Sequence, residues 1–329
     1  MADNTLIEWA DATVNAVNGC SVLSPGCTNC YAMKLAGTRL KHHPSRAGLT
    51  VETKAGPVWN GTVRLNEDAL MQPLRWKRPR RIFWNAHGDL FHEAVPDEWI
   101  DHVFAVCALT PQHTHMILTK RAERMREYMG STATRERIAR QMLENYKAWG
   151  VSALPTLIDA LANRAEETDP SIAAMPIRNV WLGVSVEDQT RADERIPDLL
   201  ATPAAVRFLS CEPLLGPINL TDITIREAAG EEPSGLTTLD ALTGLHRDAE
   251  DTITGIYGQP DPHIDWVIIG AESGRGARWM RNEWAQALVD QCKPTGVAAF
   301  VKQLSGGGPK AIHDIKQFPE GLRVREFPA

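Results

Sequence analysis

Short, uniformly apolar segments recur along this chain, and each is followed by residues with the spacing of a helix or a polar turn. The segments are 81–85, 115–119, 180–186, 206–210, 266–270 and 298–302. Strands that are apolar throughout, rather than alternating, are typical of a parallel sheet that helices bury on both faces. Repeated alternation of strand and helix predicts a doubly wound sheet or a (β/α) barrel.

The position of the polar residues favours the barrel. They gather directly after the apolar segments, which is where (β/α) barrels carry their chemistry. No glycine-rich phosphate-binding fingerprint follows any of these segments, which weakens the dinucleotide-binding alternative. With a further strand expected within 9–17, we predict an α/β fold. It is a partial TIM-like barrel of six to seven parallel strands, in one domain spanning 1–329.

Two insertions interrupt the predicted alternation. Residues 130–178 are charged and helical in pattern, so we expect a helical insertion there. Residues 221–263 are rich in Asp, Glu, Gly and Thr, which predicts an acidic surface loop. The polar, glycine-containing stretch 41–62 is also expected to be a loop.

Composition and charge limit the class of protein. The chain has 329 residues, of which 43% are hydrophobic and 23% charged, as in an ordinary globular protein. The net charge of -6 argues against a globally basic nucleic-acid binder, although a local basic patch remains compatible with it. No apolar run is long enough for a transmembrane helix, and no signal peptide is recognisable at the N-terminus. We therefore expect a cytoplasmic protein with no membrane partner.

Three of the six cysteines, Cys20, Cys27 and Cys30, form the pattern C-x6-C-x2-C. Thiolate is the soft ligand that zinc and iron–sulfur clusters select. A closed structural zinc needs four ligands, whereas three thiolates can hold a four-iron cluster with one iron left open. The pattern therefore predicts a reactive iron–sulfur site, with zinc completed by His42 or His43 as the alternative. The other cysteines, Cys107, Cys211 and Cys292, lie singly in apolar runs and are expected to be core residues, with Cys211 kept open because it ends a predicted strand.

Polar residues at the predicted strand ends would converge on one pocket mouth if the strands are parallel. They are Asn85, Asp89, Lys120, Ser185, Glu187, Glu212, Glu272 and Lys302. Several carboxylates beside one site would be costly without cationic partners, and Lys120, Arg121 and Lys302 are the candidates. We expect catalytic roles for Asp89, Lys120, Glu212 and Glu272. Cofactor binding is expected from Asn85, Ser185, Glu187 and Lys302.

One basic stretch interleaves cations with an aromatic residue and a proline, which suits phosphate contacts beside a stacking surface. Its candidate nucleic-acid-binding residues are Arg75, Trp76, Lys77, Arg78, Arg80 and Arg81. A solvated loop before a strand is the competing interpretation. Among the tryptophans, Trp59, Trp76 and Trp279 lie in polar or basic surroundings and are candidates for stacking on a base.

Several motifs together resemble a known family. They include Gly19-Cys20, Ser24-Pro25-Gly26-Cys27-Thr28-Asn29-Cys30-Tyr31-Ala32, Gly88-Asp89-Leu90-Phe91-His92, Leu118-Thr119-Lys120-Arg121, Ser210-Cys211-Glu212-Pro213-Leu214 and Gly270-Ala271-Glu272-Ser273-Gly274. This set resembles a phage- and bacterium-associated family of radical-SAM-like three-cysteine proteins, and covers most of the chain outside the two insertions. The Cys30-Tyr31-Ala32 ending is also similar to that of spore-photoproduct-lyase-related enzymes, which act on DNA lesions.

The resemblance implies a partial (β/α) barrel with a [4Fe–4S] cluster on Cys20, Cys27 and Cys30. S-adenosylmethionine would chelate the open iron, and an electron donor would drive its cleavage to a radical that attacks DNA or a nucleotide, in repair or modification. Two departures stand out: the commonest spacing in such enzymes is C-x3-C-x2-C, and no Gly-Gly-Glu follows the second strand. Asp89 or the pair Ser185 and Glu187 would have to take the place of that motif.

Two other functions stay open from the sequence. One is an iron–sulfur enzyme of the same fold that uses its cluster for photochemistry or electron transfer without S-adenosylmethionine. The other is a zinc-stabilised nucleic-acid-binding protein whose surface is the stretch 75–81. The regular array of polar residues at strand ends favours an enzyme over the second of these.

Overall fold

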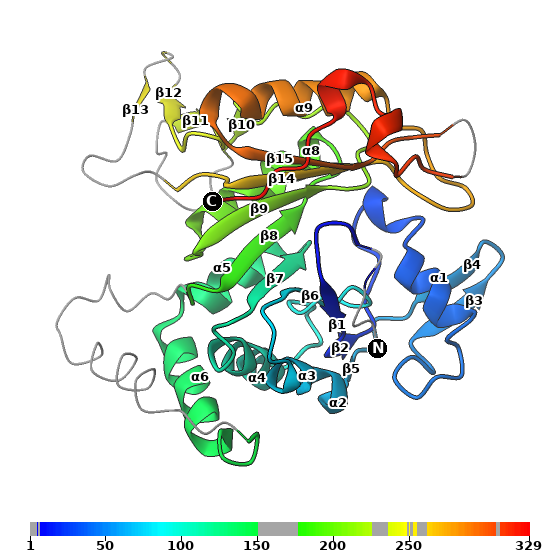
Figure 1. The fold of residues 1–329 in the computed structure, drawn as a ribbon, viewed down its shortest axis with the longest axis vertical. Coiled ribbons are helices and arrows are strands. Elements are labelled where there is room, and N and C mark those ends of the chain that lie inside the picture. Colours follow the sequence, from blue (N-terminus) through cyan, green and yellow to red (C-terminus); the bar gives the residue numbers. More distant parts are fainter. Residues whose placement is uncertain are drawn as a thin grey trace. The chain divides into compact units, whose positions relative to one another are not determined.

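The computed structural model describes residues 5, 7–150, 177–225, 236–248, 250, 253–254, 262–306 and 310–329. Within these ranges the chain is a mixed α/β protein with a seven-stranded sheet in the order β1-β6-β7-β8-β9-β14-β15 (Figure 1). The strands are β1 (Ala12–Val14), β6 (Arg81–Trp84), β7 (Thr114–Thr119), β8 (Val180–Ser185), β9 (Val206–Cys211), β14 (Trp266–Gly270) and β15 (Ala298–Gln303). The pairs β1–β6, β6–β7, β9–β14 and β14–β15 are parallel. The predicted α/β class and the six predicted apolar strands are confirmed.

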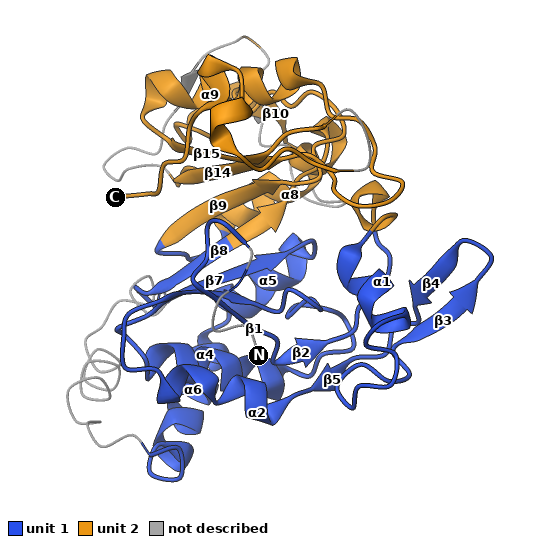
Figure 2. Ribbon diagram, turned by 45° about the vertical axis from the view of Figure 1, so that its right-hand side comes forward, with its two compact units in different colours: residues 1–23, 30–182, 202–205 blue, residues 24–29, 183–201, 206–329 orange. Residues whose placement is uncertain are grey.

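The chain divides into two compact units (Figure 2). Unit 1 contains residues 1–23, 30–182 and 202–205, and unit 2 contains residues 24–29, 183–201 and 206–329. The division falls within β8 and also on either side of the short segment 24–29, which carries Cys27. Each unit is described by itself below.

Unit 1 is built on the parallel strands β1, β6 and β7. Ile82 pairs with Ala12 on one side and with His115 on the other, and all three side chains are fully buried. The helices of this unit are α1 (Tyr31–Gly37), α2 (Glu67–Leu70), α3 (Gln72–Arg75), α4 (Asp97–Ala108), α5 (Ala122–Gly130) and α6 (Thr132–Asn145). Asp97 and Glu98 lie in the first turn of α4, where the positive end of the helix dipole favours carboxylates.

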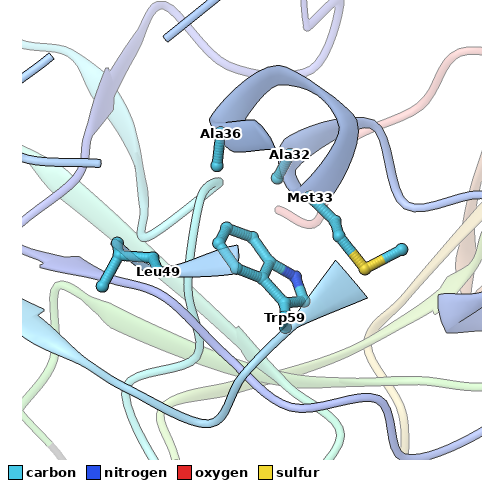
Figure 3. Packing of buried hydrophobic residues seen from close by; sticks show 5 residues of the cluster. All are labelled: Ala32, Met33, Ala36, Leu49 and Trp59. Carbon is cyan, nitrogen blue, oxygen red and sulfur yellow. The ribbon is translucent and has the colours of Figure 1, made fainter. Parts of the chain in front are cut away.

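The segment after the third cysteine packs as a small subcore of unit 1. The helix α1 lies against the hairpin of β3 (Thr50–Thr53) and β4 (Gly56–Trp59). Figure 3 shows the buried side chains of this cluster, which are Ala32, Met33, Ala36, Leu49 and Trp59. Cys20 and Cys30 pack against it. A side chain at Gly37 would overlap Pro57, so glycine is what allows the helix to approach the hairpin this closely.

This subcore corrects two expectations. The stretch 41–62 was expected to be a loop, but it contains the β3–β4 hairpin. Three of the four β3 residues are exposed, so its polar sequence carries no buried-face signal. Trp59 is a core residue rather than an aromatic side chain available for stacking on a base. The strand expected within 9–17 is divided between β1 and β2 (Val17–Asn18), which pairs with β5 (Arg64–Leu65).

Unit 2 is built on β9, β14 and β15. Trp266 pairs with Phe208 and Ala298, and every residue of β14 is buried, as a strand covered on both faces requires. Its helices are α8 (Gln189–Ala201), α9 (Asn282–Thr295) and the short 3-10 helices η1 (Pro25–Cys27), η2 (Ile315–Gln317) and η3 (Glu320–Leu322).

The described residues of the two predicted insertions contain regular structure. The helix α6 lies within 130–178, as expected, whereas 151–176 lie outside the described residues. In 221–263 the described residues include an antiparallel sheet of β10 (Ile223–Thr224), β11 (Leu236–Leu239), β12 (His246–Asp248) and β13 (Ile253–Thr254). The rest of the expected acidic loop, 226–235, 249, 251–252 and 255–261, lies outside the described residues. Ile223, Leu239 and Leu242 are buried, so scattered apolar residues in an acidic stretch are enough to anchor it. No helix in the described part of the chain is long and apolar enough to cross a membrane.

Candidate functional site

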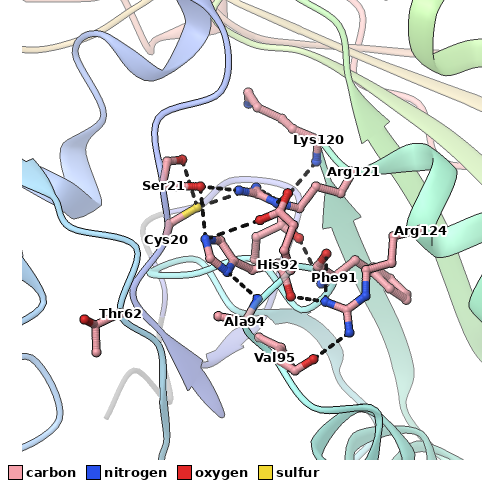
Figure 4. A network of polar contacts seen from close by, with 12 residues as sticks. Cys20, Ser21, Thr62, Phe91, His92, Ala94, Val95, Lys120, Arg121 and Arg124 are labelled. Atoms are coloured by element: carbon pink, nitrogen blue, oxygen red, sulfur yellow. Dashed lines mark hydrogen bonds and ion pairs between the residues drawn. The ribbon is translucent and has the colours of Figure 1, made fainter.

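Arg121 organises the polar groups beside the first cysteine in unit 1 (Figure 4). It follows β7, is only 7% exposed, and spreads its guanidinium over four acceptors. Nε donates to Glu93 Oε1 at 2.9 Å, and Nη2 donates to Ser21 Oγ at 2.7 Å. Nη1 donates to Asp89 Oδ2 at 3.0 Å and to Cys20 Sγ at 3.7 Å. A buried cation therefore contacts the sulfur of the first cysteine in the motif.

Asp89 is buried, and its carboxylate is fully engaged by the protein. Oδ1 accepts hydrogen bonds from Thr119 Oγ1 at 2.7 Å and from the Phe91 N–H at 3.0 Å. Oδ2 accepts from the Lys120 N–H at 3.2 Å as well as from Arg121. The predicted catalytic carboxylate therefore ties the loop after β6 to the end of β7 and holds Arg121 in place.

His92 is the second residue that holds Ser21. Its Nδ1 accepts the Ala94 N–H at 3.1 Å, so Nε2 carries the proton and donates to Ser21 Oγ at 3.0 Å. Burial, followed by the charge of Arg121, lowers the pKa of His92, which favours this neutral form. The residue next to Cys20 is thus held from two directions.

Lys120 and Asn85 keep polar groups available in unit 1. Among the described residues, the Lys120 ammonium has no ion-pair or hydrogen-bond partner. Asn85 has a left-handed φ of 57°, rare for a residue other than glycine, and its Oδ1 accepts the Val17 N–H at 2.8 Å. Its buried Nδ2 has no partner in the described part of the chain. Both residues were predicted from their places after β6 and β7.

Arg46 and His87 form a pair that the sequence did not reveal. Arg46 is buried and donates to His87 Nδ1 from Nε at 3.1 Å and from Nη2 at 2.7 Å. Burial, reinforced by the charge of Arg46, lowers the pKa of His87 to about 4, so the ring is neutral at pH 7. Arg46 lies in a stretch expected to be a loop, and no spacing links it to His87.

In unit 2, two carboxylates hold the loop that carries Cys27. The Gly26 N–H donates to Glu187 Oε1 at 3.1 Å, and Asn29 Nδ2 donates to Glu272 Oε2 at 2.9 Å. Within the loop, the Cys27 N–H donates to the carbonyl of Ser24 at 2.9 Å. The predicted cofactor-binding Glu187 and the predicted catalytic Glu272 therefore both act on the cysteine loop in this structure.

Each of these carboxylates has an arginine partner of its own. Arg195 Nη1 donates to Glu187 Oε2 at 2.9 Å and to the carbonyl of Ser185 at 2.7 Å, and all three residues are buried. Arg278 binds Glu272 through its backbone and side chain, and donates to the carbonyl of Pro25 at 2.8 Å. Burial alone would raise the pKa of Glu272, but the hydrogen bonds from Arg278 and Asn29 lower it below its ordinary value.

Cationic partners for the strand-end carboxylates were expected, but only some of them are the expected ones. Lys302, one of the expected cationic partners, contacts Glu212 Oε1 through Nζ at 2.6 Å. Arg195, on α8, and Arg278, in the loop before α9, were missed because neither belongs to a recognisable motif. A cation eight residues after Glu187 or six residues after Glu272 is the only hint.

The six cysteines separate into two groups. Cys107, Cys211 and Cys292 are buried, as expected of core residues, and burial raises the pKa of each thiol. Cys20, Cys27 and Cys30 are half-buried, and none of the six is in a disulfide. Within the described residues, no three His, Cys, Asp or Glu side chains are grouped so that they could hold a metal ion.

The basic stretch 75–81 lies away from the Arg121 network. It precedes β6, whereas Asp89 and Arg121 follow the carboxyl ends of β6 and β7, so the two features occupy opposite edges of the sheet in unit 1. Arg81 forms an ion pair with Asp11, and the guanidinium of Arg80 lies 4.8 Å from the centroid of the Trp76 ring. Exposed cations are supplied by Arg75, Lys77 and Arg78.

The fold and these contacts define a mixed α/β protein with polar networks at the carboxyl ends of parallel strands. Residues 4–324 match the model of a family described as a protein of unknown function (DUF5131), and the chain belongs to this family. No curated protein and no solved structure matches the chain.

Proposed function

We propose that this protein is an iron–sulfur enzyme of the radical-SAM type, with a [4Fe–4S] cluster held by Cys20, Cys27 and Cys30. The observation that carries the proposal is the contrast between its cysteines. The three in the motif are half-buried with polar contacts at two sulfurs, whereas the other three are core thiols. Half-buried thiols with polar neighbours, one of them beside an arginine, are better suited to metal ligation than fully buried thiols are.

The three cysteines supply the type and number of donor atoms that such a group needs. Three thiolates complete the protein share of a four-iron cluster and leave one iron open for S-adenosylmethionine. When bound, the cluster and S-adenosylmethionine would supply the electron and the radical chemistry, while the protein orients the groups and excludes water. Val22 and Leu23 lie between the first two cysteines and are 49% and 48% exposed, so apolar side chains are available there to exclude water.

The remaining polar residues then have binding and positioning roles. The half-buried ammonium of Lys120 is suited to a carboxylate or phosphate, and the buried Nδ2 of Asn85 is suited to a carbonyl or carboxylate oxygen. Asp89, Glu187 and Glu272 act through other groups, because their oxygens already hold Arg121 or the cysteine loop. Glu212 and Lys302 form an ion pair with balanced charges, which leaves them suited to hydrogen-bonding a bound polar group.

The finer parts of the proposal concern fold and location. We propose that the parallel sheet follows the plan of a partial TIM-like (β/α) barrel, which is supported by polar groups at the carboxyl ends of its strands. Six thiols and no disulfide support a reducing compartment, the cytoplasm. An electron donor completes the requirements of the reaction.

For the substrate we propose a nucleic acid or a nucleotide. Support comes from the exposed Arg75, Lys77 and Arg78 and from the neighbouring Arg80–Trp76 stack. Because this surface lies at the amino end of β6, its role would be to dock the phosphate backbone, and the reacting group would bind elsewhere, near Lys120.

The test is anaerobic reconstitution followed by reaction. We expect brown protein with about four irons and four sulfides per chain, which forms 5′-deoxyadenosine from S-adenosylmethionine after reduction with dithionite. A colourless protein with stoichiometric zinc and no iron would contradict the proposal and favour the zinc-stabilised nucleic-acid binder. A cluster that forms without any 5′-deoxyadenosine would instead indicate the photochemical or redox enzyme of the same fold.

A further inference from the structure

Arg121 contacts two consecutive residues of the cysteine motif from one rigid group. Nη1 donates to Cys20 Sγ at 3.7 Å, and Nη2 donates to Ser21 Oγ at 2.7 Å. A guanidinium has five N–H donors fixed in one plane, so both contacts form together only when the plane is correctly oriented. One rigid group therefore links the Cys20 sulfur to the hydroxyl of Ser21.

The orientation is set by the carboxylates on the other side of the guanidinium. Asp89 takes one hydrogen of Nη1, and Glu93 takes the hydrogen of Nε. Asp89 is itself fixed by Thr119 Oγ1 and by two backbone N–H groups. Because the two carboxylates balance the positive charge of Arg121, its effect on the sulfur comes mainly from the directed N–H···S hydrogen bond.

A hydrogen bond to a ligating sulfur has a known consequence. It withdraws electron density from the thiolate and stabilises the reduced, more negative form of an iron–sulfur cluster, which raises the reduction potential. We propose that Arg121 is a positioning residue that holds the Cys20 sulfur and raises the potential of the cluster bound there. This inference rests on the proposed function, and the electron comes from an external one-electron donor.

The first measurement is the midpoint potential of the reconstituted protein, titrated with dithionite and followed by electron paramagnetic resonance. In R121Q the guanidinium is lost, and in R121K a single nitrogen cannot reach all four acceptors. We expect both variants to bind iron and to show a lower midpoint potential than the wild type. The matched control is R124K, since Arg124 lies in the first turn of α5, directly after Arg121, and its hydrogen bonds go to carbonyls and Asp97. An R121K potential equal to that of R124K would overturn the inference.

The second measurement needs no cluster. In metal-free protein, the Gly19 N–H donates to the carbonyl of His87 at 3.0 Å and reports opening of the segment before Cys20. Loss of a hydrogen bond to a charged group makes local opening easier by at least a factor of about ten. We therefore expect about tenfold faster hydrogen exchange in the peptide 17–24 of R121K than in the wild type. Exchange as slow as in R124K would contradict a positioning role.

The two proposals fail in different ways. Wild-type protein that binds no iron would refute the proposed function. The hydrogen-exchange rate of metal-free R121K would still test whether Arg121 positions the segment that carries Cys20. Iron binding with unchanged potential and exchange in R121K would refute only the inference. If R121Q and R121K both fail to fold, Arg121 serves the stability of unit 1, and the inference is wrong.

Discussion

Replacing Glu187 by glutamine tests whether the cysteine loop is held by a buried ion pair. Glu187 is 1% exposed and accepts hydrogen bonds from Arg195 and from the Gly26 N–H on different oxygens. A glutamine has one acceptor oxygen, so one of these donors then faces an NH2 group. The buried guanidinium of Arg195 also loses the charge that balances it.

The magnitude follows from the burial of both partners. Removing one member of a buried ion pair destabilises a protein by about 3–5 kcal/mol, because the other charge remains buried and unpaired. Glutamine keeps the shape and one hydrogen bond, so we expect E187Q to lower the free energy of unfolding by about 3 kcal/mol. We also expect the variant to bind less iron on reconstitution, since the loop that carries Cys27 loses an anchor.

The assay is urea unfolding of metal-free protein followed by circular dichroism, with iron analysis of the reconstituted samples. The control is E194Q on α8, the helix that carries Arg195, where Glu194 forms a surface i,i+3 pair with Arg191. Such surface pairs contribute at most about 1 kcal/mol. An E187Q midpoint within error of E194Q, together with full iron content, would refute the reasoning.

Three further predictions use single measurements. D89N should lower the unfolding free energy by at least about 2 kcal/mol, because four donors converge on Asp89; an unchanged urea midpoint would contradict this. Burial lowers the pKa of His115 to about 3, below the unfolded value near 6.5. The stabilisation from the neutral ring is therefore complete above pH 6.5 and decreases as the pH is lowered toward 3. At pH 5 this lowers the free energy of unfolding by about 2 kcal/mol. The dependence of the unfolding free energy on pH should be weaker in H115N, and an equal dependence in H115N and the wild type would contradict this. R78E should reduce the slope of log Kd for DNA against log salt concentration by about one. An unchanged slope would show that the basic stretch does not contact the DNA.

The parallel sheet could be predicted because its strands are short and apolar on both faces. The segment 266–270 illustrates this, since all five residues are buried in β14. The hairpin β3–β4 could not be found in the same way. The first strand of the hairpin is mostly exposed. The hairpin is held by the packing of Trp59 against α1, a contact between residues far apart in the sequence.

In the candidate site, too, some features could be predicted from the sequence and others depend on contacts that form only in the folded chain. Positions directly after strands, such as Asp89 and Glu187, are apparent from the sequence because parallel strands end at one edge. What these carboxylates do depends on Arg121 and Arg195, whose contacts form only in the folded chain. The location of the basic stretch at the opposite edge from Asp89 could have been anticipated, because it precedes the strand that Asp89 follows.

Iron content of cysteine variants is the most direct test of the central claim. After anaerobic reconstitution, we expect about four irons per chain in the wild type and in C211A, and a loss of most iron in C20A, C27A and C30A. Cys211 is the matched control because it is a core thiol at the end of β9. Wild-type protein without iron, or a triple variant of Cys20, Cys27 and Cys30 that keeps its iron, would contradict the account.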